Sequence, residues 1–114
     1  MLEGMCIFAL HQQHNTMFVH HVFFWMNPAA TEAEKAQLHA GLSTLKSIDL
    51  IQTIHIGVPA DTNRDVIDRS YNFSLLMLFA SAAEEAQYQS HPTHLAFIDS
   101  CKHLWQKVQV YDAV

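Results

Sequence analysis

Two segments of this chain are apolar at almost every position, which limits the folds that it can adopt. Residues 18–26 and 71–79 are rich in the aromatic and β-branched residues that favour strands. Neighbouring side chains of a strand point to opposite faces, so both faces of each strand are largely apolar. In the first segment, alternation places on one face Val19, His21, Phe23 and Trp25, and on the other Phe18, His20, Val22, Phe24 and Met26. A sheet that contains these strands therefore needs dry cover on both sides.

Two capping boxes mark where helices begin. A hydroxyl residue followed three positions later by Glu occurs at Thr31–Glu34 and again at Ser81–Glu84. We expect the first helix to run to about residue 45 and the second to run through Tyr88. The buried stripe of the first helix is expected to comprise Ala36, Leu38, Leu42 and Leu45.

Pro92 interrupts the second helical region. Proline has no amide hydrogen and disfavours a helical residue before it, so the helix should end or bend near residue 90. A further helix over residues 93–103 would place on one face His94, Phe97, Ile98 and Cys101. The bend therefore brings the polar tips of Tyr88 and His94 into an otherwise apolar stretch.

The order of these elements predicts the fold class. With further strands expected at residues 50–58 and 105–111, the order is β-α-β-β-α-β. This is the α+β, ferredoxin-like pattern, a four-stranded antiparallel sheet with helices on one side. We expect the face with Phe23 and Trp25 to meet the helices and the face with His20 to meet a second copy, which gives a homodimer. Residues 17–114 would form this domain, preceded by an N-terminal extension over residues 1–16.

Charge and hydropathy argue against several classes of partner. The net charge is −5 with neutral histidines, and the six Lys and Arg residues form no basic stripe, so we expect no nucleic-acid partner. No apolar run approaches the roughly 20 residues that cross a bilayer, so we expect no membrane partner. The nine histidines outnumber Lys and Arg together, so the net charge should change strongly between about pH 5 and 7.

The cysteines favour a reducing compartment. Cys6 and Cys101 form no CxxC or zinc-knuckle spacing. The apolar run Met5–Leu10 is too short for the core of a signal peptide and follows Glu3 rather than basic residues. We therefore expect a cytoplasmic protein with reduced thiols.

Short motifs along most of the chain resemble those of one family. From Met17 onward they are Val19–Phe24, Gly41–Leu45, Ile54–Gly57, Phe79–Ser81, Tyr88–His94, Trp105–Lys107 and Tyr111–Asp112. Together they resemble the stress-responsive A/B barrel family, also called Dabb, of dimeric α/β-barrel proteins. The resemblance implies a ferredoxin-like subunit whose sheet pairs with that of a second copy to form a barrel. It implies no single activity, because most members of the family have none assigned.

The same resemblance implies a set of site residues. The family includes the plant polyketide cyclase that forms olivetolic acid by an aldol-type ring closure. By motif position, the catalytic tyrosine and histidine of that enzyme correspond to Tyr88 and His94, and its first-strand histidine to His21. The residues implied for the wall of a substrate pocket are Phe23, Trp25, Phe97 and Trp105.

The chemistry of Tyr88 and His94 supports two interpretations. As a catalytic pair, His94 would remove a proton from a carbon acid beside a carbonyl group, and Tyr88 would donate a hydrogen bond to the oxygen where charge develops. As a structural pair, the two side chains would hydrogen-bond across the bend and hold it. His91 and His94 have the spacing of a metal pair, but Pro92 breaks the helical register and a zinc site needs at least three ligands. We therefore expect no metal and no cofactor.

Three functions remain open at this point. The first is a homodimeric protein that binds a small hydrophobic metabolite in an apolar cavity without catalysis. The second is a cofactor-free cyclase or isomerase that acts on a polyketide-like carbonyl compound. The third is a cofactor-free monooxygenase. Whether the protein is an enzyme depends on whether the space between sheet and helices is open and faced by both Tyr88 and His94.

Overall fold

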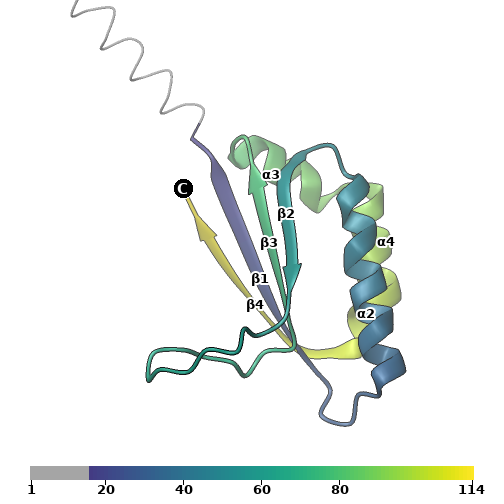
Figure 1. Ribbon diagram of the computed structural model, residues 1–114. Helices are drawn as coiled ribbons and strands as arrows, with labels where there is room; N and C mark the ends of the chain where they lie inside the picture. The colour runs from purple at the N-terminus through teal and green to yellow at the C-terminus, as the bar shows by residue number, and fades with distance from the viewer. Residues whose placement is uncertain (1–15) are drawn as a thin grey trace, which may run out of the picture.

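The computed structural model describes residues 16–114, which form one antiparallel sheet with helices packed on one face (Figure 1). The four strands lie in the order β2-β3-β1-β4. The strands are β1 (Phe18–Met26), β2 (Ile51–Gly57), β3 (Phe73–Phe79) and β4 (Trp105–Ala113). The helices are α2 (Glu32–Thr44), α3 (Ala82–Gln89) and α4 (Pro92–Cys101), with short 3₁₀ turns η1 (Leu45–Ser47) and η2 (Lys102–Leu104). The expected α+β, ferredoxin-like element order is confirmed. Residues 1–15 of the expected N-terminal extension lie outside the described residues.

Helix α2 begins at the capping box that the sequence predicts. The Thr31 hydroxyl accepts from the amide of Glu34 at 3.1 Å, and the Glu34 carboxylate accepts from the amide of Thr31 at 2.9 Å. The buried stripe comprises Leu38, Leu42 and Leu45. Ala36, which we had expected in this stripe, is exposed instead.

The sheet presents to the helices the face opposite to the one we expected. His20, Val22, Phe24 and Met26 of β1 are buried under the helices. Val19, His21, Phe23 and Trp25 point to the other side and are only partly buried. The pairing with β3 decides this, because Val22 lies opposite Leu75 and Phe24 opposite Phe73, on the β3 face that forms the core. The expectation that Phe23 and Trp25 would face the helices was wrong, since alternation alone does not tell which of two apolar faces is covered.

The uncovered side of the sheet, here called the outer sheet face, is nearly free of fixed charge. Strand register places on it four rows of residues, which are Thr53–Leu78–Val19–Ala113, His55–Leu76–His21–Tyr111, Gly57–Ser74–Phe23–Gln109 and Trp25–Lys107. Lys107 is the one Lys, Arg, Asp or Glu among these positions. Its ammonium nitrogen lies 4.4 Å from the centroid of the Trp25 ring.

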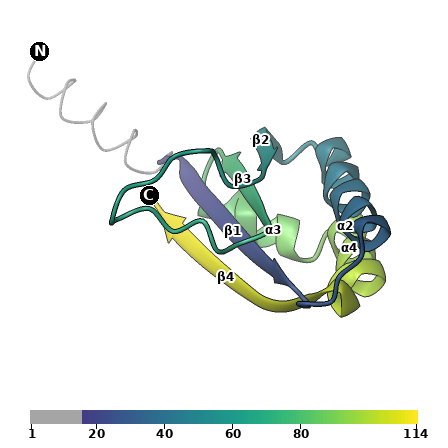
Figure 2. The ribbon, with the colours of Figure 1, turned by 60° about the horizontal axis from the view of Figure 1, so that its bottom comes forward.

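The loop over residues 58–72 projects to the side of the sheet opposite to the helices (Figures 1 and 2). The Trp25 indole donates to the Ser70 hydroxyl at 3.0 Å, which ties the loop to the outer sheet face. Most of the loop is exposed. No helix of the described residues is long and apolar enough to cross a membrane.

Helices α2 and α4 pack closely because of a glycine. A Cβ atom at Gly41 of α2 would lie 2.5 Å from the Cys101 sulfur and 3.2 Å from the nearest ring carbon of Phe97, both on α4. This close approach fixes α4 against α2 and so helps to place the face of α4 that turns toward the sheet.

Candidate functional site

A pocket of about 190 Å³ lies between the sheet and helices α3 and α4, on the side of edge strand β4. Apolar side chains form most of its surface, with contributions from β1, β3, α4 and β4. They are Val22, Phe24, Leu75, Phe97, Ile98, Trp105, Val108 and Val110. Four residues bring polar atoms to it, namely His20, Tyr88, Gln89 and His94.

Tyr88 lies in the last turn of α3 and is almost completely buried, with 1 % of its surface exposed. Its ring packs against Phe79, at a centroid distance of 5.3 Å, and against His94. Its hydroxyl makes no hydrogen bond to another described residue. Every fully buried side-chain N or O atom of the described residues has a partner, so this hydroxyl is not fully buried. The hydroxyl is therefore reachable from the pocket. Burial, and secondarily the charge of Glu85, raises the pKa of this phenol, so it stays protonated and able to donate.

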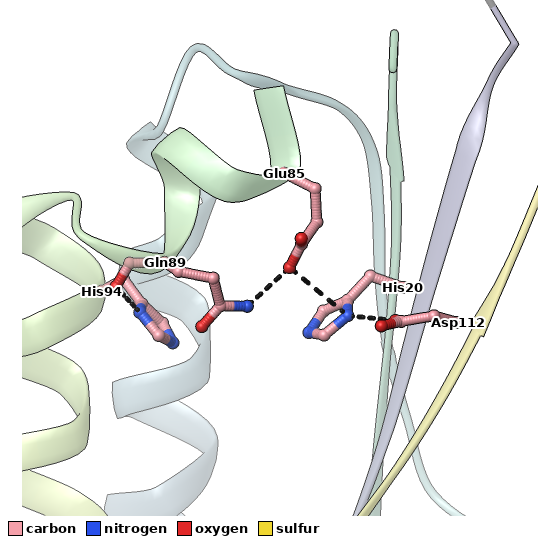
Figure 3. A network of polar contacts seen from close by, with 5 residues as sticks. All are labelled: His20, Glu85, Gln89, His94 and Asp112. Carbon is pink, nitrogen blue, oxygen red and sulfur yellow. Dashed lines mark hydrogen bonds and ion pairs between the residues drawn. The ribbon is translucent and has the colours of Figure 1, made fainter. Parts of the chain in front are cut away.

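His94 lies in the first turn of α4, and the break at Pro92 turns its ring back toward α3. Its Nδ1 atom is 3.0 Å from the carbonyl oxygen of Gln89, the last residue of α3 (Figure 3). Because a carbonyl oxygen only accepts, Nδ1 carries the hydrogen, and in the neutral ring Nε2 keeps its lone pair. Burial is the largest influence on His94 and lowers its pKa, which favours this neutral form.

His20 lies on the same side of the sheet and forms part of a polar network (Figure 3). Its Nδ1 atom is 2.5 Å from a carboxylate oxygen of Asp112 on β4 and 3.7 Å from one of Glu85 on α3. The side-chain amide of Gln89 donates a hydrogen bond of 2.6 Å to the same Glu85 oxygen. The network joins β1, β4 and α3 at the polar end of an otherwise apolar pocket.

The structure brings together only part of the set of site residues implied by the resemblance. Tyr88, His94, Phe97 and Trp105 all line the pocket. His21, Phe23 and Trp25 lie on the outer sheet face, so their expected place in this pocket was wrong.

His20 is the pocket histidine of β1, and we had placed it on the opposite face. One signal in the sequence favoured it: its face of β1 carries Phe18, Val22, Phe24 and Met26, whereas the face of His21 carries one apolar residue fewer. Asp112 and Glu85 gave no such signal, because their contacts with His20 depend on strand register and on the docking of α3.

The residues of this site do not form a metal centre of the usual kind. No group of three or more His, Cys, Asp or Glu side chains within residues 16–114 is arranged to hold a metal ion. His91, which we considered as a partner of His94, instead caps α4, with its Nδ1 accepting from the Thr93 amide at 3.1 Å.

Comparison with solved structures finds the same fold in several proteins. A Dabb family protein with a ferredoxin-like fold from Mesorhizobium loti is 26 % identical, with a TM-score of 0.70 over 86 % of this chain and 95 % of that one. The hydroxynitrile lyase from Passiflora edulis is 19 % identical, with a TM-score of 0.71 over 87 % of this chain and 93 % of that one. A dimeric ferredoxin-like protein of unknown function from Thermobifida fusca is 18 % identical, with a TM-score of 0.70 over 86 % and 90 % of the two chains.

Comparison of the sequence itself gives the family. No curated protein matches the chain significantly. The family profile of the Stress responsive A/B Barrel Domain, Dabb, matches residues 18–114, which include every strand and helix described above. The chain therefore belongs to the stress-responsive A/B barrel (Dabb) family.

Proposed function

We propose that this protein is a cofactor-independent enzyme that carries out acid–base chemistry on a small carbonyl compound in the pocket beside β4. The observation that carries the proposal is the anchoring of His94. Its Nδ1–H is held by the Gln89 carbonyl, which leaves Nε2 as a base in a pocket that Tyr88 also lines. A base held in one tautomer beside a protonated donor meets the geometric requirement for general acid–base catalysis.

The proposed step is proton removal from the carbon next to a carbonyl group. His94 Nε2 takes the proton, the C–H bonding electrons move into the C–C–O system, and the carbonyl oxygen becomes an enolate oxygen. Tyr88 donates a hydrogen bond to that oxygen as its negative charge develops. The lowered pKa of His94 keeps the base neutral near pH 7, and the raised pKa of Tyr88 keeps the donor protonated. Return of the proton from His94 to another carbon gives isomerisation. Attack of the enolate carbon on a second carbonyl of the same molecule, whose oxygen then takes the proton from His94, gives cyclisation.

The size of the pocket favours a small substrate. Its volume of about 190 Å³ is below the range of roughly 300–1,000 Å³ that is usual for drug-sized ligands. This favours a compact ketone, aldehyde or related compound over a polyketide-like chain. The apolar walls made by Phe24, Phe97 and Trp105 suit the hydrocarbon part of such a compound.

Binding without catalysis is the second candidate. The His94–Gln89 hydrogen bond also satisfies a carbonyl at the end of α3, so it has a structural use whether or not His94 is a base. In that case the pocket would hold a small apolar metabolite, and Tyr88 and His94 would only orient it.

Hydrogen–deuterium exchange distinguishes the two candidates. Cyclopentanone and acetone are incubated with the protein in D₂O, and loss of their α-proton signals is followed by NMR. Acetone cyanohydrin is added to the panel because a structural neighbour is a hydroxynitrile lyase. Turnover by the wild type that is lost in His94→Asn supports the enzyme. Ligand shifts in the pocket without exchange or turnover of any of these probes support binding alone.

A homodimer is part of the proposal. The outer sheet face carries large apolar side chains, including Phe23, Trp25 and Leu76, with a single fixed charge, and several solved neighbours are described as dimeric. A second copy laid on this face would give the barrel that the family name describes. We also propose a cytoplasmic location, which is consistent with Cys101 being a free, buried thiol.

A further inference from the structure

The outer sheet face carries a row of residues that crosses all four strands. Register places His55 of β2 and His21 of β1 opposite the same residue, Leu76 of β3, and Tyr111 of β4 opposite His21. With strands about 4.8 Å apart, the two histidines lie roughly 10 Å from each other. A second copy seated on this face would cover both of them.

Each histidine contacts another residue of the face, and His21 is partly buried whereas His55 is exposed in the single subunit. The His21 ring packs on Phe23, with ring centroids 4.3 Å apart. His55 lies over Gly57, where a Cβ atom would come within 2.8 Å of its Cε1 atom. Glycine at this position therefore makes room for the imidazole to lie against the sheet.

We propose that the homodimer formed through the outer sheet face is pH-sensitive, and that protonation of His21 and His55 dissociates it. This inference rests on the proposed homodimer and adds its regulation. Each C2 dimer would contain two copies of each histidine, so acidification would place as many as four positive charges in one dry interface.

The strand positions of the outer sheet face include no carboxylate that could compensate those charges. Lys107 is the fixed charge of the face and has the same sign as an imidazolium. A second, smaller pocket lies on the outer sheet face beside Phe23 and Trp25. The carboxylate that lines this hollow is that of Asp68, from the 58–72 loop. The same loop also carries Asp61, Arg64, Asp65 and Arg69, of which Asp61 and Arg69 lie 3.8 Å apart as an ion pair, and the tyrosines of the hollow are Tyr71 and Tyr111. Histidine is the side chain whose charge ordinarily changes between about pH 5 and 8.

The electrostatics of His21 agree with this arrangement. Burial, and secondarily the neighbouring His55, lowers the pKa of His21 already in the single subunit. A second copy would remove more water from the ring and strengthen the same effect. The neutral form is therefore the one that fits the interface, and the dimer should be the form that holds fewer protons.

The experiment is sedimentation velocity of the full chain over a concentration series at pH 7.5 and at pH 5.5. For the wild type we expect the dimer dissociation constant to rise about tenfold or more on acidification. The double variant His21→Gln/His55→Gln removes both imidazoles and should keep nearly the same dissociation constant at the two pH values. The matched control His39→Gln/His103→Gln changes two exposed histidines of α2 and η2 and should behave as the wild type. Circular dichroism at both pH values establishes that every variant remains folded.

Each other outcome overturns a particular statement. A monomer at pH 7.5 overturns the homodimer and this inference with it. A dimer with the same dissociation constant at both pH values leaves the homodimer standing and overturns the inference. A pH dependence that survives in the His21/His55 variant, or disappears in the His39/His103 control, assigns the effect to other groups and also overturns it.

Discussion

The imidazole of His94 lies against the phenol ring of Tyr88, with ring centroids 4.4 Å apart and an interplanar angle of 39°. The contact spans the break between α3 and α4, and both residues line the pocket. His94 is anchored by a hydrogen bond to the backbone, whereas the Tyr88 hydroxyl is held by none within the described chain. The two residues should therefore respond differently to substitution.

Removing the Tyr88 hydroxyl should affect chemistry more than folding. Tyr88→Phe keeps the buried ring and removes a group that bonds to no described residue, so we expect the free energy of unfolding to change by less than about 0.5 kcal/mol. Loss of the donor should slow α-proton exchange roughly 10²- to 10³-fold. Denaturant unfolding and the NMR exchange assay measure the two effects. A large loss of stability with unchanged exchange would assign Tyr88 a structural role.

Two substitutions of His94 separate its anchoring from its basicity. His94→Asn keeps an N–H donor close to the position of Nδ1 but has no basic nitrogen, so it should fold normally and lose exchange about 10²- to 10⁴-fold. His94→Ala also loses the bond to the Gln89 carbonyl and should unfold about 1 kcal/mol more easily. Equal exchange rates in the wild type and His94→Asn would eliminate the base role.

Acid should destabilise the subunit below about pH 6.5. The pKa of His94 is lowered from 6.5 in the folded chain, so the unfolded chain binds more protons in the interval between the two values. The stability that His94 contributes is therefore present above pH 6.5 and is lost as the pH falls through the lowered pKa. We expect the melting temperature to decrease over this range and to decrease less steeply in His94→Asn. Identical slopes for the two proteins would contradict this assignment.

A charge at the centre of the outer sheet face should prevent dimerisation. Leu76→Glu places a carboxylate in the row between His21 and His55, where a second copy would bury it. We expect a monomer at micromolar concentration by sedimentation velocity. Leu95→Glu is the matched control, because Leu95 is 53 % exposed on α4 and away from this face. Dimerisation of Leu76→Glu with wild-type affinity would place the interface elsewhere.

Gly41→Ala should weaken the packing of α2 on α4. The added Cβ would lie 2.5 Å from the Cys101 sulfur, and overpacking of this kind destabilises by about 1–3 kcal/mol. The double variant Gly41→Ala/Cys101→Ala removes the sulfur and should recover part of the loss relative to Cys101→Ala alone. Denaturant unfolding of the four proteins in this cycle measures the coupling. A coupling energy near zero would show that the helices adjust without the sulfur.

Local sequence patterns predicted most of the elements correctly. Strand β1 matches the expected residues 18–26, and α3 and α4 meet at Pro92 as its missing amide hydrogen requires. The site was only partly predictable, because Tyr88 and His94 are close in sequence whereas His20 and Asp112 are 92 residues apart. A contact of that kind follows from the pairing of β1 with β4.

The sequence by itself determined the order of strands and helices, the break at Pro92 and the family, because these depend on residues that are neighbours along the chain. The tertiary structure decided which face of β1 lies under the helices. Alternation along β1 offered two apolar faces with one histidine on each, and only the register with β3 and the docking of α3 and α4 select His20 for the pocket and His21 for the outer sheet face. That choice is a property of packing, since it depends on contacts between residues that are far apart in the chain.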